Sequence, residues 1–142
     1  MFRINILRAV LDSIGNITEP RQGIGILIGH FSEDELWITD CIIGGEGNKW
    51  EKLTIPPEKL AEIADEIIKR ERTTKIVGWY YSCPGGGIRM SETNLETHNR
   101  FLRLSPVCVT LVADPEIGEF GIWALERDEG VMQVRNEYIT IC

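Results

Sequence analysis

Two uninterrupted apolar segments constrain the fold more than any other feature of the sequence. Residues 75–81 (KIVGWYY) and 107–112 (VCVTLV) are short, rich in β-branched and aromatic residues, and bounded by Ser, Gly, Asp and Pro, which is typical of buried strands. Between them, Ser91 precedes an amphipathic segment that ends near residues 105–106, so we expect a helix with Ser91 as its N-cap. Strand, helix and strand in this order predict an α/β domain.

The flanking segments add elements to the same core. Residues 4–14 have apolar side chains at helical spacing and precede a Gly-Asn pair, which predicts a first helix ending there. A second helix is predicted from Pro56-Pro57 onward, because an apolar stripe follows a proline pair suited to a first turn. Strands are expected at residues 23–29, 35–44, 120–125, 131–134 and 138–141, with a polar turn at 32–34. We therefore predict one domain over residues 1–142, with helices packed on a mixed sheet.

The composition excludes several classes of function. Fifteen basic against twenty-two acidic residues give a net charge of −7, whereas a nucleic-acid groove or an anionic membrane surface requires a basic field. No apolar run approaches the roughly 18 residues of a membrane helix, and the first residues lack the features of a signal peptide. We expect a cytoplasmic protein with a protein partner, and the charge favours a basic one.

The cysteine and histidine counts limit the kinds of metal site. The four cysteines are far apart and form no CxxC pair, which favours reduced thiols in an intracellular protein over a disulfide scaffold or a structural zinc site. They are Cys41, Cys83, Cys108 and Cys142. The chain has only two histidines, so a site built from several histidines is excluded.

The segment from Ile76 to Pro115 carries a more specific pattern. Gly-Trp-Tyr at the end of a strand is followed by Ser82, Pro84, a glycine loop and Ser91. This pattern resembles the MPN/JAMM domain family, whose active members are zinc isopeptidases that remove ubiquitin in the proteasome lid and the signalosome. The resemblance covers nearly the whole chain. It implies an α-β-α domain with a mixed, largely antiparallel sheet flanked by helices, as in cytidine deaminases.

Active members of the family have a defined set of catalytic groups. Two histidines in an HxH pattern and an aspartate hold one zinc ion, and the fourth ligand is a water whose pKa the metal lowers. A glutamate on an earlier strand is the general base, and a serine near the metal stabilises the oxyanion. The serine follows HxH after seven residues, and the aspartate follows the serine after two.

This sequence departs from that pattern at four of the five positions. Tyr81 and Cys83 stand at the HxH positions, and Asn94 stands at the aspartate position. Gln22 stands at the position of the glutamate, and an amide cannot accept a proton at neutral pH. Ser91 matches, but a helix N-cap alone would explain it. The resemblance therefore implies a pseudoenzyme, for which we expect no zinc and no other cofactor.

Two alternatives keep an active centre. In the first, Cys83 is a nucleophile, His98 is its base, and Gly85, Gly86 and Gly87 offer backbone N–H groups to an oxyanion. In the second, Cys83 and His98 hold a metal together with Asn94 and Tyr81, although an amide and a phenol are weak partners for zinc. Either would make the protein a hydrolase of ubiquitin-like or peptide substrates, as a metallo-isopeptidase with rebuilt ligands or as a cysteine hydrolase.

The favoured hypothesis is a non-catalytic MPN domain that serves as a scaffold or protein-binding module. It would pair with an active MPN paralogue or with itself as a dimer, or hold a ubiquitin-like protein without cutting it. Binding residues are expected at Trp50, an aromatic beside a flexible loop that suits an interface anchor, at the glycine loop 85–87, and at His98.

Overall fold

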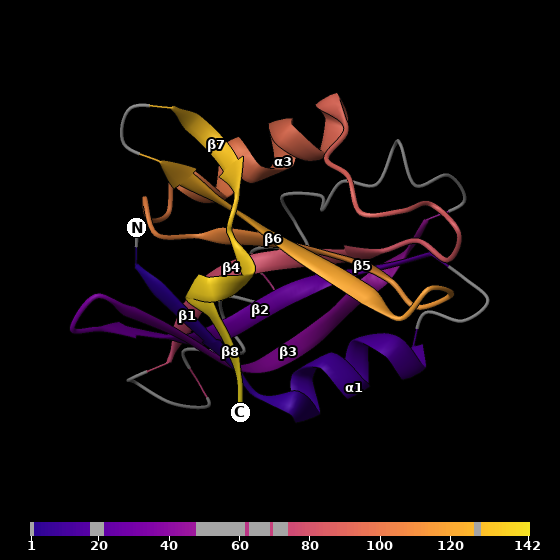
Figure 1. Ribbon diagram of the computed structural model, residues 1–142, viewed down its shortest axis with the longest axis horizontal. Helices are drawn as coiled ribbons and strands as arrows, with labels where there is room; N and C mark the ends of the chain where they lie inside the picture. Colours follow the sequence, from indigo (N-terminus) through magenta and orange to yellow (C-terminus); the bar gives the residue numbers. More distant parts are fainter. Residues whose placement is uncertain (1, 18–21, 48–61, 63–68, 70–73, 127–128) are drawn as a thin grey trace.

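The computed structural model describes residues 2–17, 22–47, 62, 69, 74–126 and 129–142 (Figure 1). For residues 16, 17, 22 and 43–47 it describes the backbone alone. Its elements, in chain order, are β1 (Arg3–Ile6), α1 (Arg8–Ile17), β2 (Gln22–Ser32), β3 (Glu35–Gly47), β4 (Lys75–Ser82), α3 (Glu92–Leu102), β5 (Val109–Asp114), β6 (Glu119–Glu126), β7 (Gly130–Gln133), the 3-10 helix η2 (Asn136–Tyr138) and β8 (Ile139–Ile141).

All strands of the described part of the chain belong to one mixed sheet. Their order is β7-β6-β5-β4-β2-β3-β1-β8. The pairs β2–β3, β2–β4, β5–β6 and β6–β7 are antiparallel, whereas β4–β5, β1–β3 and β1–β8 are parallel. The predicted fold class, a mixed and mostly antiparallel sheet with helices, is confirmed.

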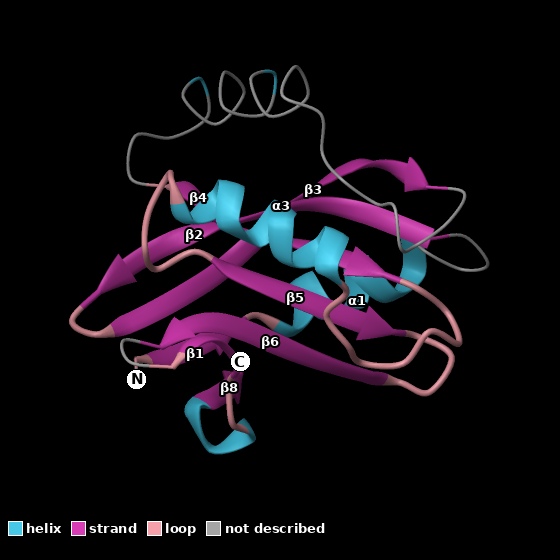
Figure 2. Cartoon of the chain, turned by 90° about the horizontal axis from the view of Figure 1, so that it is seen from above, coloured by secondary structure: helices cyan, strands magenta, loops and turns pink. Residues whose placement is uncertain are grey.

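The helices α1 and α3 cover opposite faces of the sheet (Figures 1 and 2). Val10 and Ile14 of α1 belong to one buried cluster, together with Leu27 and Tyr80. Phe101 of α3 belongs to a second cluster, together with Ile26, Trp79 and Tyr81. Adjacent residues of β2 and β4 thus enter different clusters, because successive side chains of a strand point to opposite faces. Burial on both faces explains why these strands are nearly all apolar.

The first predicted helix is wrong over its first residues. Ile4 and Ile6 lie in β1, between β3 and β8, and both are fully buried. The spacing of Ile4 to Leu7 and Val10 was compatible with a helix, but pairing of residues 4–6 to both neighbouring strands decides the local structure. The helix begins only at Arg8, and it continues through the Gly-Asn pair to Ile17.

Other boundaries shift by a few residues. The strand predicted at 35–44 extends to Gly47, because residues 45–47 pair with residues 22–24 of β2. The strand predicted at 107–112 lies at Val109–Asp114. The turn at 32–34 is confirmed, with Glu33 and Asp34 at positive φ, and the predicted tail strand is the edge strand β8.

Two predictions lie outside the described residues. Trp50 is one, and the helix from Pro56-Pro57 is the other, apart from Glu62 and Lys69, which are helical. Among the residues that the structure does describe, no helix has the length and apolar character needed to cross a membrane.

A substitution at Gly29 tests how closely β2 approaches β3. A Cβ atom on Gly29 would lie 1.6 Å from the carbonyl oxygen of Trp37 in the neighbouring strand. We expect Gly29→Ala to lower the free energy of unfolding by about 2 kcal/mol or more, because the backbone must move. Urea denaturation followed by circular dichroism measures this change. Gly15→Ala in α1 is the control: its Cβ meets nothing within 4 Å, so it should stabilise by up to about 1 kcal/mol. Equal effects of both substitutions would contradict the prediction.

Candidate functional site

The sheet register brings the positions of the degenerate motif to one end of the sheet. Ser82 at the end of β4 pairs with Gly23 of β2 on one side and with Ala113 of β5 on the other. Gln22, the first residue of β2, therefore lies at the same end; only its backbone is described. Cys83 is the first residue after β4, and its N–H donates to the carbonyl of Ala113 at 3.1 Å.

Tyr81 is a buried structural residue. Its side chain is 1% exposed, and its ring stacks on Trp79 with 5.5 Å between the ring centroids. Its hydroxyl donates a hydrogen bond to the carbonyl oxygen of Arg89 in the loop before α3. Burial raises the pKa of this phenol well above its ordinary value of 10.0, although the nearby positive charge of Arg89 opposes the shift. The hydroxyl therefore stays protonated and connects β4 to that loop.

The glycine loop is held by a residue that the sequence analysis did not single out, Asp114. The N–H of Gly85 donates to Asp114 Oδ1 at 2.9 Å, and the N–H of Gly87 donates to Oδ2 at 2.8 Å. Gly86 donates to the carbonyl of Cys83 at 3.0 Å. All three N–H groups that the cysteine-hydrolase hypothesis assigned to an oxyanion are therefore occupied within the chain.

Asp114 is itself almost fully buried, with 1% of its surface exposed. Burial alone raises the pKa of its carboxyl, but backbone N–H groups of Gly85, Gly87, Glu116 and Ile117 together bring it below the ordinary value of 3.8. An ionised carboxylate in such a place requires these donors, since a buried charge without partners is strongly unfavourable.

Ser91 and Asn94 form a capping box at the start of α3. Ser91 Oγ accepts from the Asn94 N–H at 3.1 Å, and Asn94 Oδ1 accepts from the Ser91 N–H at 3.2 Å. Ser91 Oγ also donates to Asn94 Oδ1 at 2.6 Å. Both residues thus satisfy backbone donors that every helix N-terminus leaves open. Asn94 is fully buried, and its Nδ2 has no hydrogen-bond partner in the described part of the chain.

His98 lies one helical turn after Asn94 and is also fully buried. Its Nδ1 is hydrogen-bonded to Thr110 Oγ1 of β5 at 2.6 Å. Its Nε2 has no hydrogen-bond partner among the residues described, so Cys83 does not provide one. Burial lowers the pKa of His98 to about 4. The imidazole is neutral at physiological pH. The hydrogen-bonded pair of Cys83 and His98 that a cysteine hydrolase needs is not assembled in this structure.

The residues at the family's zinc-ligand positions do not fit a catalytic zinc site. A carboxamide ligates through its oxygen, and Asn94 Oδ1 already accepts from Ser91. The Tyr81 hydroxyl is protonated and donates to Arg89. Cys83 is a buried thiol, and one suitable ligand falls short of the three that catalytic zinc requires. In the described ranges, no group of three or more His, Cys, Asp or Glu residues is placed to hold a metal ion.

The residues missed by sequence reasoning are Asp114 and Thr110. Asp114 stands before Pro115 at the end of an apolar strand, where an aspartate is read as a turn residue. Its partners Gly85 and Gly87 lie 29 and 27 residues earlier, and no spacing rule connects such positions. Thr110 is one polar residue inside a buried strand, which is a signal that it needs an internal partner.

A profile of the JAB1/Mov34/MPN/PAD-1 ubiquitin protease family matches residues 4–107. The chain belongs to the JAB1/MPN family. This match includes β1–β4 and α3, and it therefore covers every degenerate position from Gln22 to Asn94.

Curated relatives agree with this membership. The chain is 33% identical over 121 residues to the NAD(+) hydrolase TcpA of a Theionarchaea archaeon, which covers 83% of this chain and 36% of that protein. It is 29% identical to the 26S proteasome regulatory subunit rpn11 of Schizosaccharomyces pombe, over 68% of this chain and 32% of the relative. It is 27% identical to the COP9 signalosome complex subunit 5 of Kluyveromyces lactis, over 66% and 25%. The chain thus spans about a third or less of these relatives.

Asp114 gives a first prediction for the site. Asp114→Asn removes the charge and turns one acceptor into a donor that faces backbone N–H groups, so we expect a loss of about 1–3 kcal/mol in the free energy of unfolding at pH 7. Because the folded pKa is lowered, this stabilisation is present above pH 3.8 and is lost as the pH falls through the folded pKa. Denaturation at pH 7 and at pH 3 measures both effects. A difference between variant and wild type that does not shrink at pH 3 would exclude this role.

His98 gives a second prediction. Its pKa falls from 6.5 to about 4 on folding, so the unfolded chain binds more protons in this window. Stability should therefore decrease by up to about 3 kcal/mol as the pH falls from 6.5 to 4. His98→Gln should flatten this part of the profile, measured by urea denaturation at several pH values. The control is His30→Gln, an exposed residue near the end of β2, which should keep the wild-type slope. Identical slopes for His98→Gln and wild type would refute the assignment.

Proposed function

We propose that this chain is a non-catalytic JAB1/MPN domain, extending over residues 1–142, that acts as a scaffold or protein-binding module. One observation carries the proposal: the side chains at the former zinc-ligand positions are engaged in the fold itself. Asn94 caps α3 together with Ser91, and Tyr81 connects β4 to the loop before α3. Residues with these bonds have a structural reason to be present without any catalytic one.

The relatives support a role within a protein assembly. Two of them are named as subunits, one of the 26S proteasome and one of the COP9 signalosome. By analogy, the partner of this chain is a protein, namely an active MPN paralogue, a second copy of the chain, or a ubiquitin-like protein that is held and not cleaved. Cytoplasmic placement belongs to the same proposal. The name of the archaeal relative adds NAD(+) hydrolysis as an activity that the experiments must include.

A cleavage assay tests the proposal. The purified chain is incubated with diubiquitin and with a fluorogenic ubiquitin substrate, with added zinc and with a chelator, and separately with NAD(+). We expect no turnover in any arm and less than about one tenth of an equivalent of bound zinc by mass spectrometry, because the available donors cannot complete the metal's ligand set. An active JAB1/MPN isopeptidase serves as the positive control.

Two variants identify the source of any turnover. Chelator-sensitive cleavage that Asn94→Ala abolishes would establish a rebuilt metal centre. Chelator-resistant cleavage that Cys83→Ala abolishes would establish a cysteine hydrolase. Cys108→Ala is the matched control for the second variant, since Cys108 is equally buried but lies at the opposite end of β4, with Sγ 3.9 Å from the carbonyl oxygen of Ile76. Either result would replace the proposed scaffold role by an enzymatic one.

A further inference from the structure

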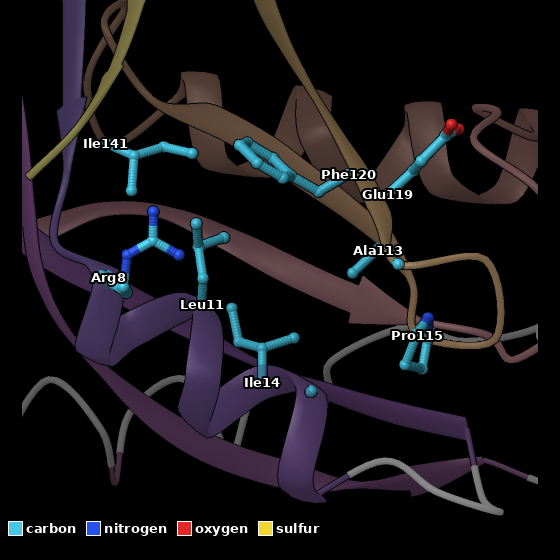
Figure 3. Close-up of a pocket in the computed structure, with 10 residues that line it drawn as sticks. Arg8, Leu11, Ile14, Ala113, Pro115, Glu119, Phe120 and Ile141 are labelled. Carbon is cyan, nitrogen blue, oxygen red and sulfur yellow. The ribbon is translucent and has the colours of Figure 1, made fainter.

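A groove lies along β6. Its first cavity is lined by α1, β6, β8 and the end of β5, and its second by β6, β8 and the residues Ile88, Gln133 and Asn136. The two adjoining cavities have volumes of about 380 and 490 Å³. Gly118, Glu119, Phe120 and Ile141 line both cavities. Figure 3 shows the first of them, with α1 on one side and β6 and β8 on the other. Together the cavities form an elongated site.

The walls of the first cavity are mainly apolar. Leu11 and Ile14 of α1 face Phe120 of β6 and Ile141 of β8 across the first cavity (Figure 3). Ile141 is 40% exposed, although it is a large apolar residue. An apolar lining of this kind is the usual inner surface of a binding site.

The groove also presents two open sheet edges. Strand β7 pairs with residues 123–126 of β6, and Val134 N–H adds one hydrogen bond to the carbonyl of Ile122. Beyond that point, residues 119–121 have β5 on one side and no described strand on the other. Strand β8 likewise pairs with β1 on one side only. Unpaired strand edges hold backbone donors and acceptors that an added strand can satisfy.

Two charged residues, Arg8 and Glu119, line the first cavity. Arg8 is the first residue of α1, and its guanidinium lies between Leu11 and Ile141 (Figure 3). It forms no ion pair within the described part of the chain. The carboxylate of Glu119 points away from this cavity (Figure 3). The part of the first cavity between Leu11 and Ile141 therefore presents a positive charge, although the chain as a whole carries −7.

We propose that this groove binds an extended apolar segment of a partner protein that adds to the open edge of β6 and places an acidic side chain against Arg8. The proposal rests on the proposed protein-binding function and names the surface and the chemistry of the partner. The open edge of β6 favours a peptide over a small carboxylate, because only a peptide backbone supplies the alternating donors and acceptors that the edge lacks. The guanidinium favours an acidic residue, which it can bind through two parallel hydrogen bonds.

Selection from a phage-displayed library of random dodecapeptides against the full chain tests this proposal. We expect enriched peptides to contain alternating apolar residues and at least one Asp or Glu. One enriched peptide is then titrated into isotope-labelled protein, where the amide resonances of residues 119–121 and 139–141 should shift. Hydrogen exchange at residues 119–121 should slow when the peptide is bound.

Paired variants locate the binding site. Arg8→Glu and Ile141→Asp should each weaken peptide binding by about tenfold or more, through the lost ion pair and the lost apolar wall. Both residues are exposed, and melting followed by circular dichroism checks that each variant folds. Arg103→Glu and Leu104→Asp are the matched controls: these exposed residues lie at the end of α3 on the other face, and their substitution should leave the affinity unchanged.

Several outcomes would overturn the proposal. They are an absence of enriched peptides, enriched peptides without an acidic residue, and an affinity that neither Arg8→Glu nor Ile141→Asp changes. Resonance shifts with octanoate but with no peptide would make the groove a site for small carboxylates instead. These results are independent of the cleavage assay. Turnover of ubiquitin substrates would refute the scaffold role and leave peptide binding standing. A failure of peptide binding would refute the role of the groove and leave the result of the cleavage assay unchanged.

Discussion

The carboxylate of Asp114 lies at the end of β5 and accepts hydrogen bonds from two segments at once. One is the glycine loop, through Gly85 and Gly87, and the other is the turn that follows β5, through Glu116. Gly85 and Gly87 have φ near +80°, a backbone conformation that lets both N–H groups converge on one carboxylate with little strain. The position of Cys83, which directly precedes this loop, and the path of the chain into α3 both depend on this arrangement.

The positions that correspond to the family's catalytic residues lie together at one end of the sheet. The ends of β4 and β5, the start of β2 and the N-terminus of α3 meet as the family resemblance implies. At that meeting point Tyr81 and Asn94 make hydrogen bonds that stabilise local structure. The carboxylate of Asp114 is turned toward backbone N–H groups of the glycine loop. Hydrogen bonds among the chain's own groups therefore stabilise the end of the sheet that carries the family's motif positions.

Local patterns were sufficient to predict much of the fold. Ser91 as an N-cap, the polar turn at 32–34 and the buried strand at 75–81 were all correct, because each depends on neighbouring residues. The residues Ile4–Ile6 were misassigned, because their structure is decided by pairing with β3 and β8, which no local pattern reveals. The site shows the same division. The motif positions follow from spacing, whereas the bonds of Asp114 to the glycine loop and of His98 to Thr110 arise only from the tertiary fold.

The pairing of β1 with β8 joins the two ends of the described chain. Ile4 lies opposite Ile139, the N–H of Cys142 donates to the carbonyl of Ile6, and the N–H of Arg8 donates to the carbonyl of Cys142. Contacts of such large sequence separation carry a high loop-closure entropy and slow the folding of a chain. During synthesis, the edge of β1 that pairs with β8 stays unpaired until residues 139–141 have left the ribosome. An unpaired strand edge is a template for association with other chains, so this pairing also removes a site of aggregation.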